Sequence, residues 1–186
     1  MNWHMVHSSE IESLSASRQF LAFSDAYLTS AAHLCSHLAA APAESTYTKG
    51  AVVLSLTFHG VELFLKAAIL ERAPTEQFSG NLGHNLQHLS RRYANLYPAK
   101  KFDLDIPFHA EEIDFASLDP AIAEELKTFI AEHERDTPID QIHRYPRDTE
   151  GNPWEGIFAF EANSFSLVVV KVQQDIGRIS ALIWHG

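Results

Sequence analysis

Four polar side chains interrupt the longest apolar stretch of the chain, at about residues 49–70. With about 100° between successive residues of a helix, the four fall within about 60° of one another: Ser55, His59, Glu62 and Lys66. A carboxylate, an ammonium and an imidazole on an otherwise apolar helix are costly to bury unless they pair or face a cleft. Glu62 precedes Lys66 by one helical turn, the favourable order, so we expect an ion pair.

Two interpretations of this polar stripe stay open. The first adds the segment Gly83-His84-Asn85-Leu86, whose histidine begins the next predicted helix. Its ring and the free backbone N–H groups at a helix start can face the stripe, which predicts an anion- or nucleotide-binding cleft with Lys66 and His84 as donors. The second interpretation is a buried polar network that fixes the register of the helices. The candidate ligand-binding residues are Glu62, Lys66, His84, His59 and Arg144.

Two histidine pairs with helical spacing raise the question of a metal site. His84 and His88 are one turn apart, as are His33 and His37, but a zinc site needs three or four ligands. Di-metal sites in bundles usually show Glu-x-x-His on each of two helices, and only the reversed His59-x-x-Glu62 is present. We therefore predict no metal. We also predict no cofactor, because the chain has neither a phosphate-binding Gly-rich loop nor a dinucleotide fingerprint.

A second cluster of chemically active side chains is His143-Arg144-Tyr145-Pro146-Arg147. Arginine binds phosphate in a bidentate manner, so this cluster could contact phosphate or RNA. The alternative is that its arginines offset neighbouring acids such as Asp140 or Asp148.

The composition is that of one ordinary globular domain, residues 1–186, with a loose leader at 1–9. Fourteen basic and 24 acidic residues give a net charge of −10, which disfavours broad nucleic-acid binding but leaves room for a local basic patch. The single cysteine, Cys35, excludes an internal disulfide framework and falls on an apolar helix face, where a buried hydrophobe is expected. Residues 1–14 carry no secretory signal. We expect a cytoplasmic protein without a membrane segment.

Helical periodicity predicts five helices that position these groups, at about residues 11–40, 46–73, 84–97, 119–136 and 163–184. We expect N-caps at Ser9 or its neighbour, at Ser45 or Thr46, at Asp119, and at Asn163 or Ser164. The valine run 168–170 favours a strand locally, but the length of the periodic pattern favours a helix. Two short runs, 141–145 and 156–160, predict a small β-hairpin. The predicted fold is an all-α, up-and-down bundle with this hairpin before the last helix.

The central helix and the segment after it resemble a known family. The helix reads V-E-L-F-L-K-A-A-I-L and is followed, after a loop, by G-H-N-L-Q-H-L. This pattern resembles the HEPN superfamily, many of whose members show a Glu-Leu-x-x-Lys helix followed by Gly-His-Asp/Asn-Leu. The tripeptide Arg144-Tyr145-Pro146 is similar to one in some relatives. The resemblance is firmest over residues 52–93 and makes Glu62, Lys66 and His84 the family-like positions.

The resemblance implies a bundle of four or five helices that often forms a homodimer. Many HEPN proteins are RNases of toxin–antitoxin, defence or RNA-processing systems, whereas others bind nucleotides or act with nucleotidyltransferases. Catalytic members carry Arg, four to six residues, then His. Here seven residues separate Arg135 from His143, and Thr137-Pro138 lies between them. This departure from the pattern weighs against RNase activity.

We therefore expect a HEPN-like binding or regulatory module for a nucleotide, an RNA or a partner protein, in a toxin–antitoxin or defence context, rather than an enzyme. One alternative is a metal-independent RNase in which Arg135 or Arg144 polarises a phosphate and His143 is the base. Another is a purely structural subunit. We also expect a homodimer through the last helix, where apolar side chains exceed what one bundle can cover: Phe165, Val169 and Trp184.

Overall fold

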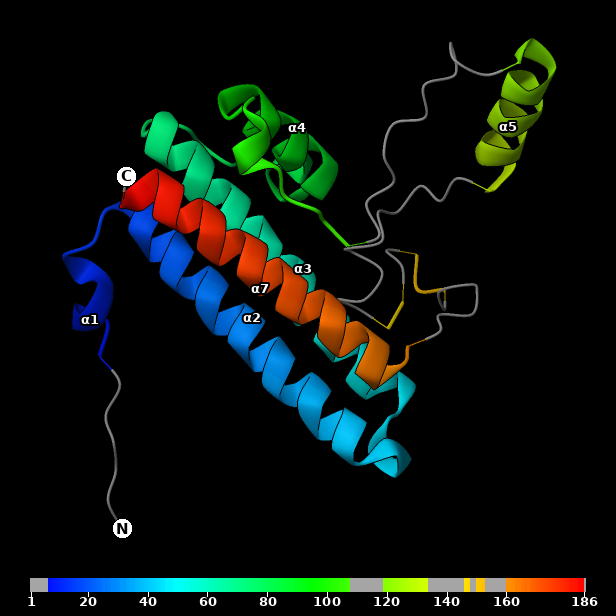
Figure 1. Ribbon diagram of the computed structural model, residues 1–186, viewed down its shortest axis with the longest axis horizontal. Helices are drawn as coiled ribbons and strands as arrows, with labels where there is room; N and C mark the ends of the chain where they lie inside the picture. Colours follow the sequence, from blue (N-terminus) through cyan, green and yellow to red (C-terminus); the bar gives the residue numbers. More distant parts are fainter. Residues whose placement is uncertain (1–6, 108–118, 134–145, 148–149, 153–159, 186) are drawn as a thin grey trace.

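Three long helices form the body of the protein (Figure 1). The computed structural model describes residues 7–107, 119–133, 146–147, 150–152 and 160–185. Helix α2 (Ala16–Ala40) packs against both α3 (Tyr47–Arg72) and α7 (Ala162–Trp184). Throughout these described residues the regular structure is helical and no strand occurs. The predicted all-α bundle is therefore confirmed.

The remaining helices are shorter. Helix α4 (Leu86–Leu96) packs against α3, and α1 (Ser9–Glu12) is a single turn. Helix α5 (Pro120–His133) stands away from the three long helices in Figure 1. Three 3-10 turns complete the described elements: Pro42–Glu44, Asn81–His84 and Lys100–Phe102.

Helix α5 starts where the sequence predicts, but one of its large apolar side chains is exposed. Asp119 accepts a hydrogen bond from the backbone N–H of Ala121, as expected of a capping residue. Ile122 belongs to the apolar positions that repeat with helical spacing, yet 56% of its surface is exposed. Helical spacing identifies an apolar face without saying whether another element covers it.

The first predicted helix is divided in two. A continuous helix from about residue 11 is predicted, but α1 ends at Glu12 and α2 begins at Ala16. Ser15, in an extended conformation, accepts the backbone N–H of Arg18 and so caps α2. The side-chain amide of Gln19 donates to the carbonyls of Ile11 and Leu14, which ties the intervening turn to α2. The N-cap position of α1 is Ser8, the neighbour of Ser9, although its side chain makes no capping hydrogen bond. The second helix start, at Ser15, was not predicted.

Helix α3 is the central element, as predicted. It begins after Thr46, whose hydroxyl accepts the backbone N–H of Lys49, and residues 60–70 are all buried. Its length and composition would also suit a membrane span, but 78% of its most apolar window is buried inside the protein. The apolar surface of α3 is thus covered by the bundle itself.

Close contacts with α2 fix the register of α3. The hydroxyl of Ser24 donates to the carbonyl of Gly60 at 2.7 Å, and that of Ser17 donates to the carbonyl of Ala67 at 3.0 Å. Gly60 lies so close to Leu28 that an added Cβ would be 2.7 Å from the leucine Cγ. A glycine here permits the two helices to approach closely. This approach sets where Glu62 and Lys66 lie in the bundle.

Helix α7 confirms the preference for helix over strand at the valine run. Its N-cap is Glu161, not Asn163 or Ser164, because the glutamate carboxylate accepts the backbone N–H groups of both those residues. Hydrogen bonds from the side chain and backbone of Ser164 and from the backbone of Asn163 lower the pKa of Glu161 to about 2. Near the start of the helix, the Cys35 thiol donates to the carbonyl of Ala162, and burial raises its pKa. Cys35 is therefore a buried core residue, as predicted.

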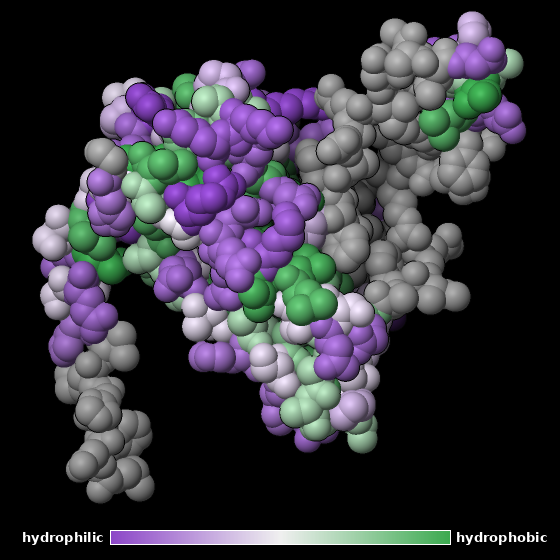
Figure 2. Space-filling model, in the orientation of Figure 1, coloured by the Kyte–Doolittle hydropathy of each residue, from purple (hydrophilic) through white to green (hydrophobic). Residues whose placement is uncertain are grey.

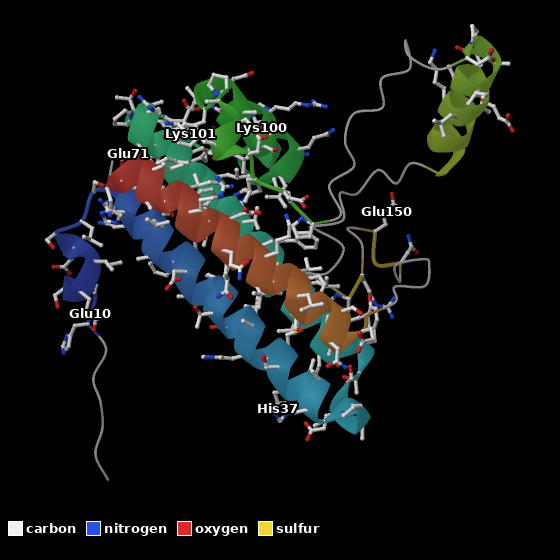
Figure 3. The ribbon with its side chains drawn as sticks, viewed as in Figure 1. Glu10, His37, Glu71, Lys100, Lys101 and Glu150 are labelled. Atoms are coloured by element: carbon white, nitrogen blue, oxygen red, sulfur yellow. The ribbon has the colours of Figure 1, made fainter. Side chains whose placement is uncertain are left out.

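The C-terminal end of α7 is joined to both other long helices. The indole N–H of Trp184 lies 3.1 Å from the hydroxyl of Ser17 and 2.8 Å from a carboxylate oxygen of Glu71. Figure 3 shows Glu71 at the end of α3, beside the end of α7. Arg18 donates to the carbonyl of Trp184. The Trp184 side chain therefore binds two other helices of the same chain.

The apolar residues expected at a dimer interface are largely buried in the core of this chain. Phe165 is 5% exposed and Val169 is fully buried, so that part of the dimer expectation was wrong. Other apolar side chains of α7 are exposed instead: Leu167, Val170 and Leu182. Figure 2 shows mainly hydrophilic residues over the middle of α7, with hydrophobic patches toward its two ends.

The predicted hairpin falls mostly outside the described residues. This applies to run 141–145 and to run 156–160, except for Phe160. The Phe160 ring lies 5.6 Å from that of Phe165, and it packs against Gly50 of α3.

Candidate functional site

A carboxylate that solvent does not reach lies at the centre of the polar cluster. Glu62 is 0% exposed, and its Oε1 atom lies 2.7 Å from Nζ of Lys66 and 2.9 Å from Nδ1 of His84. Its Oε2 atom lies 3.5 Å from Nδ1 of His59. The predicted pairing of Glu62 with Lys66 and with His84 is confirmed.

The sequence places these groups by two different routes. His59, Glu62 and Lys66 follow one another at three- and four-residue intervals on α3, so the helix alone brings them to one face. Ser55, the fourth member of the predicted stripe, is half-buried. His84 comes from a separate segment, 22 positions after Glu62. Its position depends on the loop after α3.

The loop that carries His84 is folded tightly on itself. The backbone N–H of Gly83 donates to the carbonyl of Gly80, whose φ of +65° lies in the left-handed region that favours glycine. A Cβ added at Gly83 would lie 2.8 Å from the carbonyl carbon of Phe78. His84 ends this turn, and Asn85, not His84, caps α4 by accepting the backbone N–H of His88.

Aromatic side chains cover the buried part of the cluster. The Lys66 ammonium lies 5.3 Å from the ring centroid of Phe78, a distance at which cation–π attraction operates. The Phe78 ring meets the edge of Phe20 from α2, with 6.2 Å between centroids. On the other side, Tyr27 of α2 packs edge-on against His59, with 4.5 Å between centroids. Lys66 is thus enclosed by a carboxylate and an aromatic ring.

The members of the cluster differ in how far a ligand could reach them. The side chain of Lys66 is 5% exposed, and that of Glu62 is not exposed at all. His59 is 30% exposed and His84 is 54% exposed. His84 is therefore the group best placed to contact a ligand, and Lys66 acts on it through Glu62.

Sequence reasoning missed the aromatic residues around the cluster. Phe20, Tyr27 and Phe78 belong to α2 and to the loop, and no local pattern links them to α3. The available signal was indirect: Gly80 and Gly83 flank the approach to His84, and glycines in a loop allow close backbone contacts.

The other predicted site residues cannot be placed in this cluster. Arg135, His143 and Arg144 lie outside the described residues. Arg147 is described and exposed, and it donates to the carbonyl of Gly151. The spatial relationship of the Arg/His pair invoked for an RNase stays a prediction.

Histidine pairs of the described chain are not part of a larger ligand set. His37 lies 3.3 Å from Glu44, which also accepts a hydrogen bond from Lys49. Across the described residues, no group of three or more His, Cys, Asp or Glu side chains is arranged to hold a metal ion.

Two grooves lined by described residues lie away from Glu62, one of about 420 Å³ between α2 and α7 and one of about 410 Å³ beside α4.

No family model, curated protein or solved structure matches this chain. The resemblance to the HEPN superfamily therefore stays a prediction that rests on the Glu-Leu-x-x-Lys helix and the Gly-His-Asn-Leu segment.

Proposed function

We propose that this protein is a HEPN-like binding or regulatory module, which holds a nucleotide, an RNA or a partner protein at the cluster around Glu62. The proposal rests on one observation above all. A fully buried carboxylate receives donors from two separate elements, and one of those donors, His84, is more than half exposed. A network needed only for helix register has no requirement for an exposed imidazole from a loop.

The charges around Glu62 favour recognition of a ligand by short-range contacts over long-range attraction of a polyanion. Lys66 neutralises Glu62 inside the protein, so neither group adds a field for long-range attraction of a polyanion. The chain as a whole carries −10. Recognition at this site would therefore depend on hydrogen bonds and shape at His84, with a weak dependence on salt compared with a basic nucleic-acid-binding face.

We also propose a homodimer, with an interface formed by apolar residues of α7 other than those first expected. Leu167 is 72% exposed and Val170 is 44% exposed on α7, while Phe23 of α2 is 50% exposed. A symmetric interface that includes this face of α7 would cover Leu167 and Val170. Light scattering should give twice the 20.8 kDa chain mass at micromolar concentration. Leu167→Lys should shift the mass toward the monomer, and a monomeric wild-type protein would contradict the dimer.

The binding proposal is tested by calorimetric titration with the four ribonucleoside monophosphates and a short single-stranded RNA. Saturable binding is expected for at least one of them. His84→Ala should weaken it about tenfold or more, whereas His88→Ala, which removes an exposed histidine one turn further along, should preserve it. Absence of binding, or binding that His84→Ala leaves unchanged, would contradict nucleotide or RNA binding at this site.

A further inference from the structure

The contacts of Glu62 determine which nitrogen of His84 carries a proton. An ammonium can only donate, so Oε1 of Glu62 accepts from Lys66 at 2.7 Å. A carboxylate paired in this way has no proton to give. The 2.9 Å contact between the same oxygen and Nδ1 of His84 is therefore a hydrogen bond in which the imidazole donates.

This direction fixes what His84 presents to solvent. A neutral imidazole has one N–H and one lone pair, on opposite nitrogens. In the neutral ring, Nδ1–H is directed at the buried carboxylate and Nε2 carries the lone pair. The side chain is 54% exposed while its partner is 0% exposed, which places the protonated nitrogen inward. Carboxylate partners orient imidazoles in the same way in many sites where the second nitrogen contacts a metal or substrate.

We propose that Nε2 of His84 is a hydrogen-bond acceptor that recognises an N–H or O–H donor of a nucleoside, such as a base edge or a sugar hydroxyl, and not a phosphate group. This rests on the proposed binding function. Glu62 and Lys66 are positioning residues that hold the ring and its proton. Lys66, expected from the sequence to donate to an anion, is directed instead to Glu62 and enclosed by Phe78.

The same geometry disfavours phosphate. A deprotonated phosphate oxygen offers only lone pairs and would face the lone pair of the neutral ring at Nε2, without a donor between them. The nearest ammonium is 5% exposed and already paired. An amino, imino or hydroxyl donor meets no such conflict, and it completes the hydrogen bonding of the ring.

The protonation state can be measured without any ligand. Nitrogen-15 NMR of histidine-labelled protein at neutral pH should show His84 with a protonated Nδ1 and a bare Nε2. The double variant Glu62→Gln/Lys66→Met removes both buried charges together, which protects the fold, and should lower the fraction of this tautomer. A wild-type spectrum with His84 protonated at Nε2 would overturn the inference.

Ligand binding tests the chemical class. Adenosine, guanosine, cytidine and uridine are compared with inorganic phosphate, ribose 5-phosphate and a short RNA. At least one nucleoside, or the RNA, should bind without competition from phosphate, and His84→Ala should weaken binding about tenfold or more, the loss of one well-formed hydrogen bond. His88→Ala should change it less than about twofold. RNA binding without nucleoside binding would place the donor on a strand, in support of the inference.

The outcomes separate this inference from the proposed function. If phosphate alone binds or competes, and His84→Ala removes that binding, the site binds ligands but the acceptor assignment is wrong. If a folded wild-type protein binds none of these probes, this inference is wrong, and of the proposed function only the binding of a partner protein is left.

Discussion

The Nζ atom of Lys66 lies 2.7 Å from Oε1 of Glu62, and solvent reaches neither group beyond 5% of its side-chain surface. Pairs with this one-turn spacing on exposed helices contribute only about 0.3–0.5 kcal/mol. A buried pair behaves differently, because the removal of one partner leaves the other charge without compensation in a poorly solvated environment.

Glu62→Ala should therefore lower the free energy of unfolding by about 3–5 kcal/mol, measured by denaturant titration. The matched control Glu62→Gln/Lys66→Met leaves no unpaired charge and should lose much less. A loss below about 1 kcal/mol in Glu62→Ala would indicate that the pair behaves as an exposed one.

Gly60 lies inside α3 and Gly177 lies inside α7, and we predict opposite effects on stability when each is replaced by alanine. A Cβ at Gly60 would lie 2.7 Å from Cγ of Leu28, whereas a Cβ at Gly177 would meet nothing within 4 Å. Gly60→Ala should cost about 1–3 kcal/mol through overpacking. Gly177→Ala should stabilise by up to about 1 kcal/mol, because alanine favours helix. Thermal unfolding of the two variants checks this, and a stabilising Gly60→Ala would contradict the close approach of α2 and α3.

Glu161 predicts a pH-dependent contribution to stability. Hydrogen bonds from Ser164 and Asn163 lower its pKa from 4.5 to about 2 in the folded protein. A lowered carboxyl pKa means that the cap contributes fully above pH 4.5 and that its contribution is lost as the pH falls toward about 2. The stability difference between wild type and Glu161→Ala should be largest at neutral pH and shrink below pH 4.5. A difference that does not vary with pH would show that the carboxylate does not cap α7.

We predict that the protein has no intrinsic RNase activity. Seven residues, Thr137 and Pro138 among them, separate Arg135 from His143, so the pair does not share the close spacing that catalytic HEPN members use. A misplacement of about 1 Å can cost on the order of a hundredfold in rate. Purified protein incubated with total RNA and short oligomers should leave them intact. Cleavage that disappears in His143→Ala would support the alternative enzyme.

Local spacing predicted the parts of the site that one helix can place. Glu62 and Lys66 are on the same face of any helix that contains them, and Thr46 is a favourable cap in its position. His84 could be linked to them only through the family-like Gly-His-Asn-Leu segment, because its distance from Glu62 along the chain is bridged by a loop.

What the sequence did not predict depends on contacts between elements. Phe78 reaches Lys66 because the loop turns back over α3, and Gly60 matters because Leu28 packs against it. Glu161 was missed because glutamate is not among the residues preferred at N-caps, although its longer side chain reaches the same N–H groups. The exposed Ile122 shows the same limit for α5, since periodicity does not identify the element that covers a face.

The most direct test of the account is NMR of the histidine rings during titration with a nucleotide or RNA that binds. We predict that the ring signals of His84 shift most, that those of His59 shift less, and that those of His33, His37 and His88 stay in place. Shifts confined to other histidines, with the His84 ring unchanged at saturation, would contradict the claim that the Glu62 cluster is the ligand-binding site.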